Sequence, residues 1–320
     1  MKTHKNTLFL IFLIALVLSS CRKNEVININ NTKPPVVIPN TPFSTKFFIE
    51  NIVPSQFFTF NASNYWEIKG KKGTNIYFYP GGLKNPAGNI VTGNVEIELK
   101  EIYSKGDMIL SGIFPISYGK LLVSGGEIFL KVKQNGVELH ITDTNHVKVK
   151  MPYDGVDTNT MYVFSSDSLK LYSKTDSTGW GTQGPPVTVI DSFGIKSYGF
   201  PYPVGNFQWI NTDYLEWGPN PLTMIYANTQ DTSFNDLNTL IFISFKGKNI
   251  AVRLQDNNLK NFIKGNIPTQ SDVTFIAISE KNGQYYSSFS DSKIVLNHKQ
   301  NMTLTPTTMA QIKAQLALLQ

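Results

Sequence analysis

The stretch that decides the fold runs from Ile128 to Met151 and reads IFLKVKQNGVELHITDTNHVKVKM. Two sets of apolar residues in it occupy every second position: Ile128, Leu130 and Val132, and then Val147, Val149 and Met151. This period of two is typical of half-buried strands. Between the two sets, Asn135-Gly136 is the dipeptide that favours a two-residue type I′ hairpin. The stretch therefore predicts antiparallel strands joined by tight turns.

The same pattern extends in both directions along the chain. Apolar and polar residues alternate from Val95 to Lys100, and residues 240–245 and 250–254 flank a hairpin turn at 246–249. A further turn contains Asn282-Gly283. We therefore expect an all-β fold with two antiparallel β-sandwich-like domains, because several short strands with turn signals are typical of sandwiches.

Composition sets the expected domain boundaries. Residues 173–206 are rich in Gly, Pro, Ser and Thr, which indicates a linker. The first domain is expected at 46–172 and the second at 207–320. Two short helices are predicted in the second domain, one around Leu259 to Ile263 and one at the C-terminus, with Thr305 as its N-cap and Pro306 as its first residue.

The N-terminal segment predicts secretion and a lipid anchor. Residues 8–18 form an apolar run of 11 residues after a basic start, which is too short for a transmembrane helix. Leu-Ser-Ser-Cys at 18–21 resembles a bacterial lipobox, which implies cleavage before Cys21 and a diacylglyceryl group on its sulfur. We expect residues 1–20 to be a signal peptide and residues 21–45 to be a flexible tether, rich in Asn, Thr and Pro.

Charge and cysteine content exclude some classes of protein. The formal net charge is +6, and it falls to +4 in a chain that begins at Cys21, because Lys2 and Lys5 are removed. The basic residues are scattered, so a nucleic-acid partner is not expected. Cys21 is the only cysteine, which excludes an intramolecular disulfide.

Two segments carry a family resemblance. Residues 73–80 (GTNIYFYP), followed by 85–93 (NPAGNIVTG), resemble a pattern in uncharacterised outer-membrane lipoproteins of Bacteroidota, and Ser124-Gly125-Gly126 continues it. This part is also loosely similar to the β-sandwich domain of ankyrins and netrin receptors. Residues 207–213 (FQWINTD) look like a second marker of the same lipoproteins, with Thr212 where many of them carry Cys. The resemblance implies a β-sandwich and a lineage, and it assigns no activity.

Recognised catalytic and metal motifs are absent from the sequence, so we expect no cofactor and no metal. His140 and His146 flank a turn that contains Asp143, but the expected pairing of residue 141 with 146 places the two rings on opposite faces. The oxygen-rich loop with Asp154, Asp157 and Asn159 lacks the spacing of an EF-hand. Asx side chains of this kind are also common in ordinary turns.

Two classes of function remain. The first is a non-enzymatic lipoprotein that serves as a binding or scaffolding module, anchored in the outer membrane with the periplasmic face slightly favoured. Its partners would be the membrane, other outer-membrane proteins or glycans. The alternative is a hydrolase acting on glycans or peptides through paired carboxylates. The candidates for that role are Glu96, Glu98, Glu101 and Asp107.

The aromatic segment 198–217 supplies the expected contact surface of a binding module, because aromatic rings near loops stack on sugars or partner side chains. The candidate ligand contacts are Trp217, Tyr214, Asn211 and Asp213. Trp209 is expected in the core, since it shares a strand face with Phe207.

Overall fold

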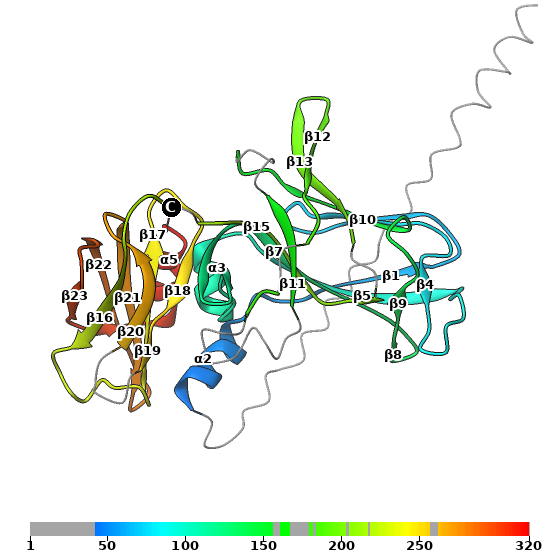
Figure 1. The fold of residues 1–320 in the computed structure, drawn as a ribbon. Coiled ribbons are helices and arrows are strands. Elements are labelled where there is room, and N and C mark those ends of the chain that lie inside the picture. The colour runs from blue at the N-terminus through cyan, green and yellow to red at the C-terminus, as the bar shows by residue number, and fades with distance from the viewer. Residues whose placement is uncertain are drawn as a thin grey trace, which may run out of the picture.

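The computed structural model describes residues 42–155, 161–166, 179–181, 184–202, 205–216, 218–256 and 262–319. Most of these residues lie in β-strands, and a short helix precedes the C-terminus, so the predicted all-β class is confirmed. The strands form sandwich-like pairs of sheets (Figure 1). The expected lipidation site Cys21 and the expected signal peptide lie outside the described residues. No helix in the described part of the chain is long and apolar enough to cross a membrane.

The first sandwich consists of two antiparallel sheets. One has the order β1-β5-β7-β15-β11, with two short strands, β6 and β8, paired to β7. Its strands are β1 (Gln56–Asn61), β5 (Asn94–Ile102), β6 (Ile116–Ser117), β7 (Lys120–Gln134), β8 (Val137–Glu138), β11 (Tyr162–Ser166) and β15 (Trp209–Leu215). The facing sheet has the order β12-β13-β10-β3-β2. Its strands are β2 (Trp66–Lys69), β3 (Asn75–Phe78), β10 (Val147–Pro152), β12 (Thr188–Ser192) and β13 (Ile195–Pro201).

The predicted alternation builds the core between these sheets. Val95, Ile97 and Leu99 of β5 are buried and pack with the apolar residues of β7 and β10. A small sheet closes one end of this sandwich. Its strands are β4 (Leu83–Lys84), β9 (His140–Ile141) and β14 (Gly205–Asn206).

The second sandwich has its own apolar core. Its sheets have the orders β19-β20-β16-β23 and β18-β17-β21-β22-β24. The strands of the first are β16 (Leu222–Thr229), β19 (Gln255–Asp256), β20 (Phe262–Pro268) and β23 (Lys299–Met302). Those of the second are β17 (Thr239–Phe245), β18 (Ala251–Arg253), β21 (Asp272–Lys281), β22 (Gln284–Lys293) and β24 (Thr305–Thr307). All pairs in both sheets are antiparallel except β16 with β23, which is parallel.

A third apolar cluster joins the two sandwiches. Three helices contribute to it and lie between or beside the sheets: α2 (Phe43–Asn51), α3 (Lys105–Ser111) and α5 (Met309–Leu316) (Figure 1). Trp209 of the first sandwich and Phe242 of the second belong to this same cluster. At the start of β7, Leu121 and Val123 reach the second core. The two sandwiches therefore share a packed apolar junction.

Both predicted Asn-Gly turns are confirmed. Asn135 and Gly136 have φ angles of 51° and 81°, and the flanking residues Gln134 and Val137 are paired. Asn282 and Gly283 have φ angles of 52° and 76°. Positive φ at both central residues is what a type I′ turn requires, and Asn and Gly tolerate it best.

The expected linker and domain boundary differ from the structure. Within residues 173–206, β12 and β13 extend the sheet that contains β10 and β3. β15, expected to open the second domain, lies in the first sandwich between β7 and β11. Gly, Pro, Ser and Thr are compatible with short edge strands as well as with linkers, so composition alone misplaced the boundary.

The helix predictions need three corrections. Helix α2 begins at Phe43, inside the expected tether, because Phe43 and Phe47 are buried at the junction. Residues 262–268 form strand β20 and not a helix. The C-terminal helix starts later than expected: Thr308 caps it and forms a capping box with Gln311.

Candidate ligand-binding groove

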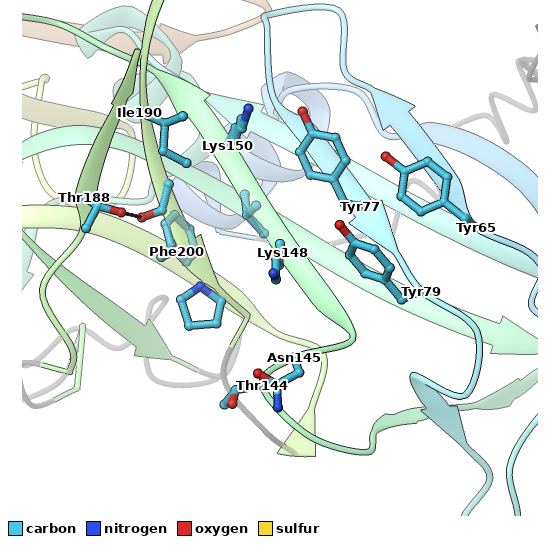
Figure 2. A pocket seen from close by; sticks show the side chains of 13 residues that line it. Tyr65, Tyr77, Tyr79, Thr144, Asn145, Lys148, Lys150, Thr188, Ile190 and Phe200 are labelled. Atoms are coloured by element: carbon cyan, nitrogen blue, oxygen red, sulfur yellow. Dashed lines mark hydrogen bonds between the residues drawn. The ribbon is translucent and has the colours of Figure 1, made fainter. Parts of the chain in front are cut away.

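A groove of about 470 Å³ lies on the outer face of the β2-β3-β10-β13-β12 sheet, away from the core (Figure 2). Tyrosines and lysines are its most prominent side chains. The residues that line it are Tyr65, Tyr77, Tyr79, Thr144, Asn145, Lys148, Val149, Lys150, Thr188, Ile190, Gly199, Phe200 and Pro201.

Strand alternation places the lysines in the groove. In β10, Val147, Val149 and Met151 point into the core, so Lys148 and Lys150 project from the opposite face. Lys148 stands directly across from Tyr77 of β3. Successive outward side chains on a strand are about 7 Å apart at their Cα atoms. The groove thus presents two cations along one strand beside aromatic rings on the next.

Three tyrosines form one wall (Figure 2). The ring centroids of Tyr65 and Tyr79 are 5.2 Å apart, and these side chains are 49% and 38% exposed. Lys148 Nζ lies 5.6 Å from the Tyr79 ring centroid, and Lys150 Nζ lies 5.5 Å from that of Tyr77. These distances are in the range of cation–π interactions, which stabilise the two lysine side chains beside the rings.

The lining carries two positive charges and no carboxylate. Among the described residues, neither Lys148 nor Lys150 forms an ion pair with an acidic side chain. Burial, and then the charge of Glu67, raise the pKa of both Tyr65 and Tyr77 above the usual value of 10. The phenols are therefore neutral hydrogen-bonding groups near pH 7, and the net charge of the groove is positive.

The opposite wall depends on a glycine. A Cβ atom at Gly199 would lie 2.2 Å from Cδ1 of Ile190, so the Ile190 side chain of the neighbouring strand β12 packs directly over this glycine of β13. Thr188 Oγ1 donates a hydrogen bond of 3.0 Å to the Gly199 carbonyl (Figure 2). These contacts fix the wall of the groove that faces the tyrosines.

The contact residues expected from the sequence lie elsewhere. Asn211 and Asp213 are completely buried in β15, so neither forms an exposed contact. The reason is that β15 has paired strands on both sides, β7 and β11, and its side chains are covered on both faces. Tyr214 is half-buried, and Trp217 lies outside the described residues. Trp209 is buried, as predicted.

The carboxylates of the hydrolase alternative do not form one solvated row. Glu96 is exposed, whereas Glu101 is buried. The Glu101 carboxylate accepts hydrogen bonds from the backbone amides of Lys72 and Thr74 at 2.9 Å each, and from Gln56 Nε2 at 2.7 Å. This side chain organises the turn before β3.

The two histidines are also arranged differently from the prediction. β9, which contains His140, pairs with β4 and β14, and β10 pairs with β3 and β13, so residues 141 and 146 are not partners. His146 Nδ1 lies 2.8 Å from Asp143 Oδ2. In the described part of the chain, no cluster of three or more His, Cys, Asp or Glu side chains is found. Asp154 bonds with the Tyr198 hydroxyl, while Asp157 and Asn159 lie outside the described residues.

Residues 76–79 carry a signal for this groove in the sequence. Tyr77 and Tyr79 alternate with the buried Ile76 and Phe78. Large aromatic rings on the solvent face of a strand are unusual enough to suggest a contact surface. Which strand lies beside β3 was not predictable, because β10 follows it by some 70 residues.

Comparisons with protein-family models, with curated proteins and with solved structures find no match for this chain.

Proposed function

We propose that this protein is a binding module of the bacterial cell envelope, and that the tyrosine–lysine groove binds an acidic oligosaccharide. The observation that carries the proposal is the pair of lysines, Lys148 and Lys150, beside exposed tyrosine rings in a groove without carboxylates. Sugar rings stack on aromatic faces, and the carboxylate of a uronic acid or the sulfate of a sulfated sugar pairs with lysine. A neutral glycan would leave the two cations unused.

The remaining lining suits a polar, ring-shaped ligand. Thr144 and Asn145 lie at one end of the groove and offer side-chain hydrogen bonds. The hydroxyls of Tyr65 and Tyr77 offer more, because the raised pKa of these two groups keeps them protonated. Sites for small ligands are usually lined by aromatic and apolar side chains with a small number of polar groups among them.

The test compares two polymers with the same sugar backbone, one with free carboxylates and one with neutral methyl esters. Affinity electrophoresis with polygalacturonate and with its fully methyl-esterified form should show retardation by the first and much weaker retardation by the second. Tyr79→Ala and the double variant Lys148→Gln/Lys150→Gln should each weaken binding about tenfold or more, because they remove a stacking surface or both counter-charges. Lys293→Gln, an exposed lysine on the second sandwich, is the matched control.

Equal retardation by both polymers would contradict the acidic specificity. Unchanged binding in Tyr79→Ala and in the double lysine variant would contradict the groove as the site. Both variants alter exposed or half-exposed side chains, so their folding can be checked by an unchanged melting temperature.

We also propose that Cys21 anchors the chain to the outer membrane through a lipid, with the periplasmic face slightly favoured. The support is the lipobox and the short apolar run of the sequence. Cys21→Ser should abolish incorporation of radiolabelled palmitate and move the chain out of the membrane fraction. Continued membrane association of a Cys21→Ser chain would contradict the proposal.

The hydrolase alternative receives no support from the geometry. Glu101 accepts three hydrogen bonds inside the fold. Asp107, in the first turn of α3, accepts a hydrogen bond from the N-cap residue Ser104 and pairs with Lys72. We therefore propose a non-enzymatic role.

A further inference from the structure

Two acidic side chains, Glu127 and Asp213, are completely buried between β7 and β15. Both carboxyl oxygens of Glu127, and Oδ1 of Asp213, have no hydrogen-bond partner among the described residues. Buried polar atoms in folded proteins are nearly always paired, and an unpaired group calls for an explanation such as an ion. These three oxygens therefore need a physical explanation.

Sheet geometry brings the two acids to the same face. Glu127 stands opposite Asn211, and Ser124 stands opposite Asp213. Partners across an antiparallel pair point to the same side, as do residues two apart on one strand. Asn211 confirms this, because its Nδ2 donates to Asp213 Oδ2 while its Oδ1 accepts a 2.9 Å bond from Ser124 Oγ.

The strand pair is irregular at this point. Between the two matched pairs, β7 has two residues, Gly125 and Gly126, and β15 has only Thr212. This is a β-bulge, which leaves backbone groups outside the regular ladder. A Cβ atom at Gly125 would stand 2.7 Å from Met161 Cε, so side chains pack closely over the bulge. The site combines carboxylate, amide and hydroxyl oxygens of buried side chains.

Electrostatics disfavour this arrangement without a cation. Both side chains are acidic, and no basic side chain among the described residues forms an ion pair with either of them. The other charged groups that act on the pair, Asp107 and Asp154, are also acidic. Buried charges in proteins are normally paired or coordinate a metal.

We propose that Glu127 and Asp213 bind one Ca²⁺ ion at the β7–β15 bulge. Two carboxylates match the charge of a divalent cation, and a donor set made only of oxygen suits Ca²⁺ better than Zn²⁺, which takes nitrogen and sulfur. Calcium sites complete their coordination with neutral amide oxygens and water, and Asn211 brings an amide group beside Asp213. Such a mixed set needs no third acidic residue.

The ion would also stabilise the junction between the sandwiches. Asn249 of the second sandwich donates a 2.8 Å hydrogen bond to the Ser124 carbonyl and accepts a 3.1 Å bond from the Ser124 amide. Ser124 in turn bonds to Asn211 at the proposed site. Calcium would therefore hold in place the strand segment on which the second sandwich docks.

The test measures calcium and stability together on the full-length chain. Because the site is enclosed, the protein is refolded from urea at pH 7.5 in EDTA, in CaCl₂ or in MgCl₂. We expect one calcium per chain by mass spectrometry of the metal after desalting. We also expect the melting temperature to be roughly 5 °C higher in calcium, at about 100 times the dissociation constant, than in EDTA.

Two variants and a control isolate the site. Glu127→Gln and Asp213→Asn should lose both the bound calcium and the calcium-dependent shift, and they should still fold because each removes a buried charge. Glu138→Gln, which alters an exposed partner of Lys131 on the same sheet, should respond like the wild type. A wild-type melting temperature that is equal in calcium and EDTA, with no retained metal, would overturn the proposal. So would a shift that persists in Glu127→Gln.

Discussion

The ring of Tyr103 lies directly against Gly126, where a Cβ atom would stand 2.2 Å from Tyr103 Cε1. The Tyr103 hydroxyl is 2.7 Å from Thr74 Oγ1, and Thr74 immediately precedes β3 in the facing sheet. Burial raises the pKa of Tyr103 well above 10, so the hydroxyl keeps its proton. Tyr103 thus crosses from one sheet of the first sandwich to the other, and only glycine at 126 leaves room for its ring.

Gly126→Ala is therefore expected to destabilise the protein by about 2–5 kcal/mol, from overpacking and from its φ angle of 134°. Gly136→Ala is the matched control, because it also has a positive φ (81°) but no atom within 4 Å of an added Cβ. That variant should cost only about 1 kcal/mol. Urea denaturation measures both, and equal losses would show that the Tyr103 contact does not constrain position 126.

Predictions from short stretches of sequence were correct where a residue type strongly favours one backbone conformation. Asn135-Gly136 and Asn282-Gly283 predicted two hairpins, and the alternation from Ile128 to Met151 predicted buried and exposed faces. These features depend on residues close together in the chain. Trp209 is buried as predicted, but it packs in a different cluster from Phe207, because β15 is covered on both faces.

Long-range pairing was not predictable. β15 lies beside β7, about 80 residues earlier, and this pairing buried Asn211 and Asp213, which polarity alone suggested were exposed. The groove likewise depends on β10 pairing with both β3 and β13. Period-two patterns tell which residues share a face, but they do not tell which strands are neighbours.

Trp209→Ala should lower the free energy of unfolding by about 3–5 kcal/mol, the usual range for deleting a large buried aromatic. Trp209 is 2% exposed, and its ring centroid lies 5.3 Å from that of Phe129 within the cluster that joins the two sandwiches. Tyr118→Ala, at a side chain that is 62% exposed, should cost much less. A similar denaturation midpoint for the two variants would contradict a structural role of Trp209 at the junction.

Glu101→Gln tests whether this acid is structural. Its two oxygens accept bonds from two backbone amides and from Gln56, whereas glutamine has one oxygen and would point an NH₂ group at a donor. We expect a loss of about 2–3 kcal/mol, since hydrogen bonds to a charged group are stronger than neutral ones. Glu96→Gln on the same strand is exposed and should be nearly neutral. A Glu101→Gln protein as stable as the wild type would disprove this role.

The buried Lys105 should make the free energy of unfolding depend on pH. It is 4% exposed at the start of α3, and its Nζ donates a 2.6 Å hydrogen bond to the carbonyl of Phe245 at the end of β17. Burial lowers its pKa from 10.5 to about 8. Between these two values the folded chain binds fewer protons than the unfolded chain, so this group makes the free energy of unfolding rise with pH.

The variant Lys105→Met keeps the unbranched apolar stem and removes the titration. The stability of the wild type relative to Lys105→Met should therefore increase by about 2–3 kcal/mol between pH 7 and pH 10. Urea denaturation of both proteins at each pH gives this difference. Subtracting one free energy from the other cancels the contributions of the tyrosines and other lysines that titrate in the same range. A difference that does not change with pH would mean that the Lys105 ammonium keeps its ordinary pKa. In that case the contact between α3 and β17 would not exclude water from the amine.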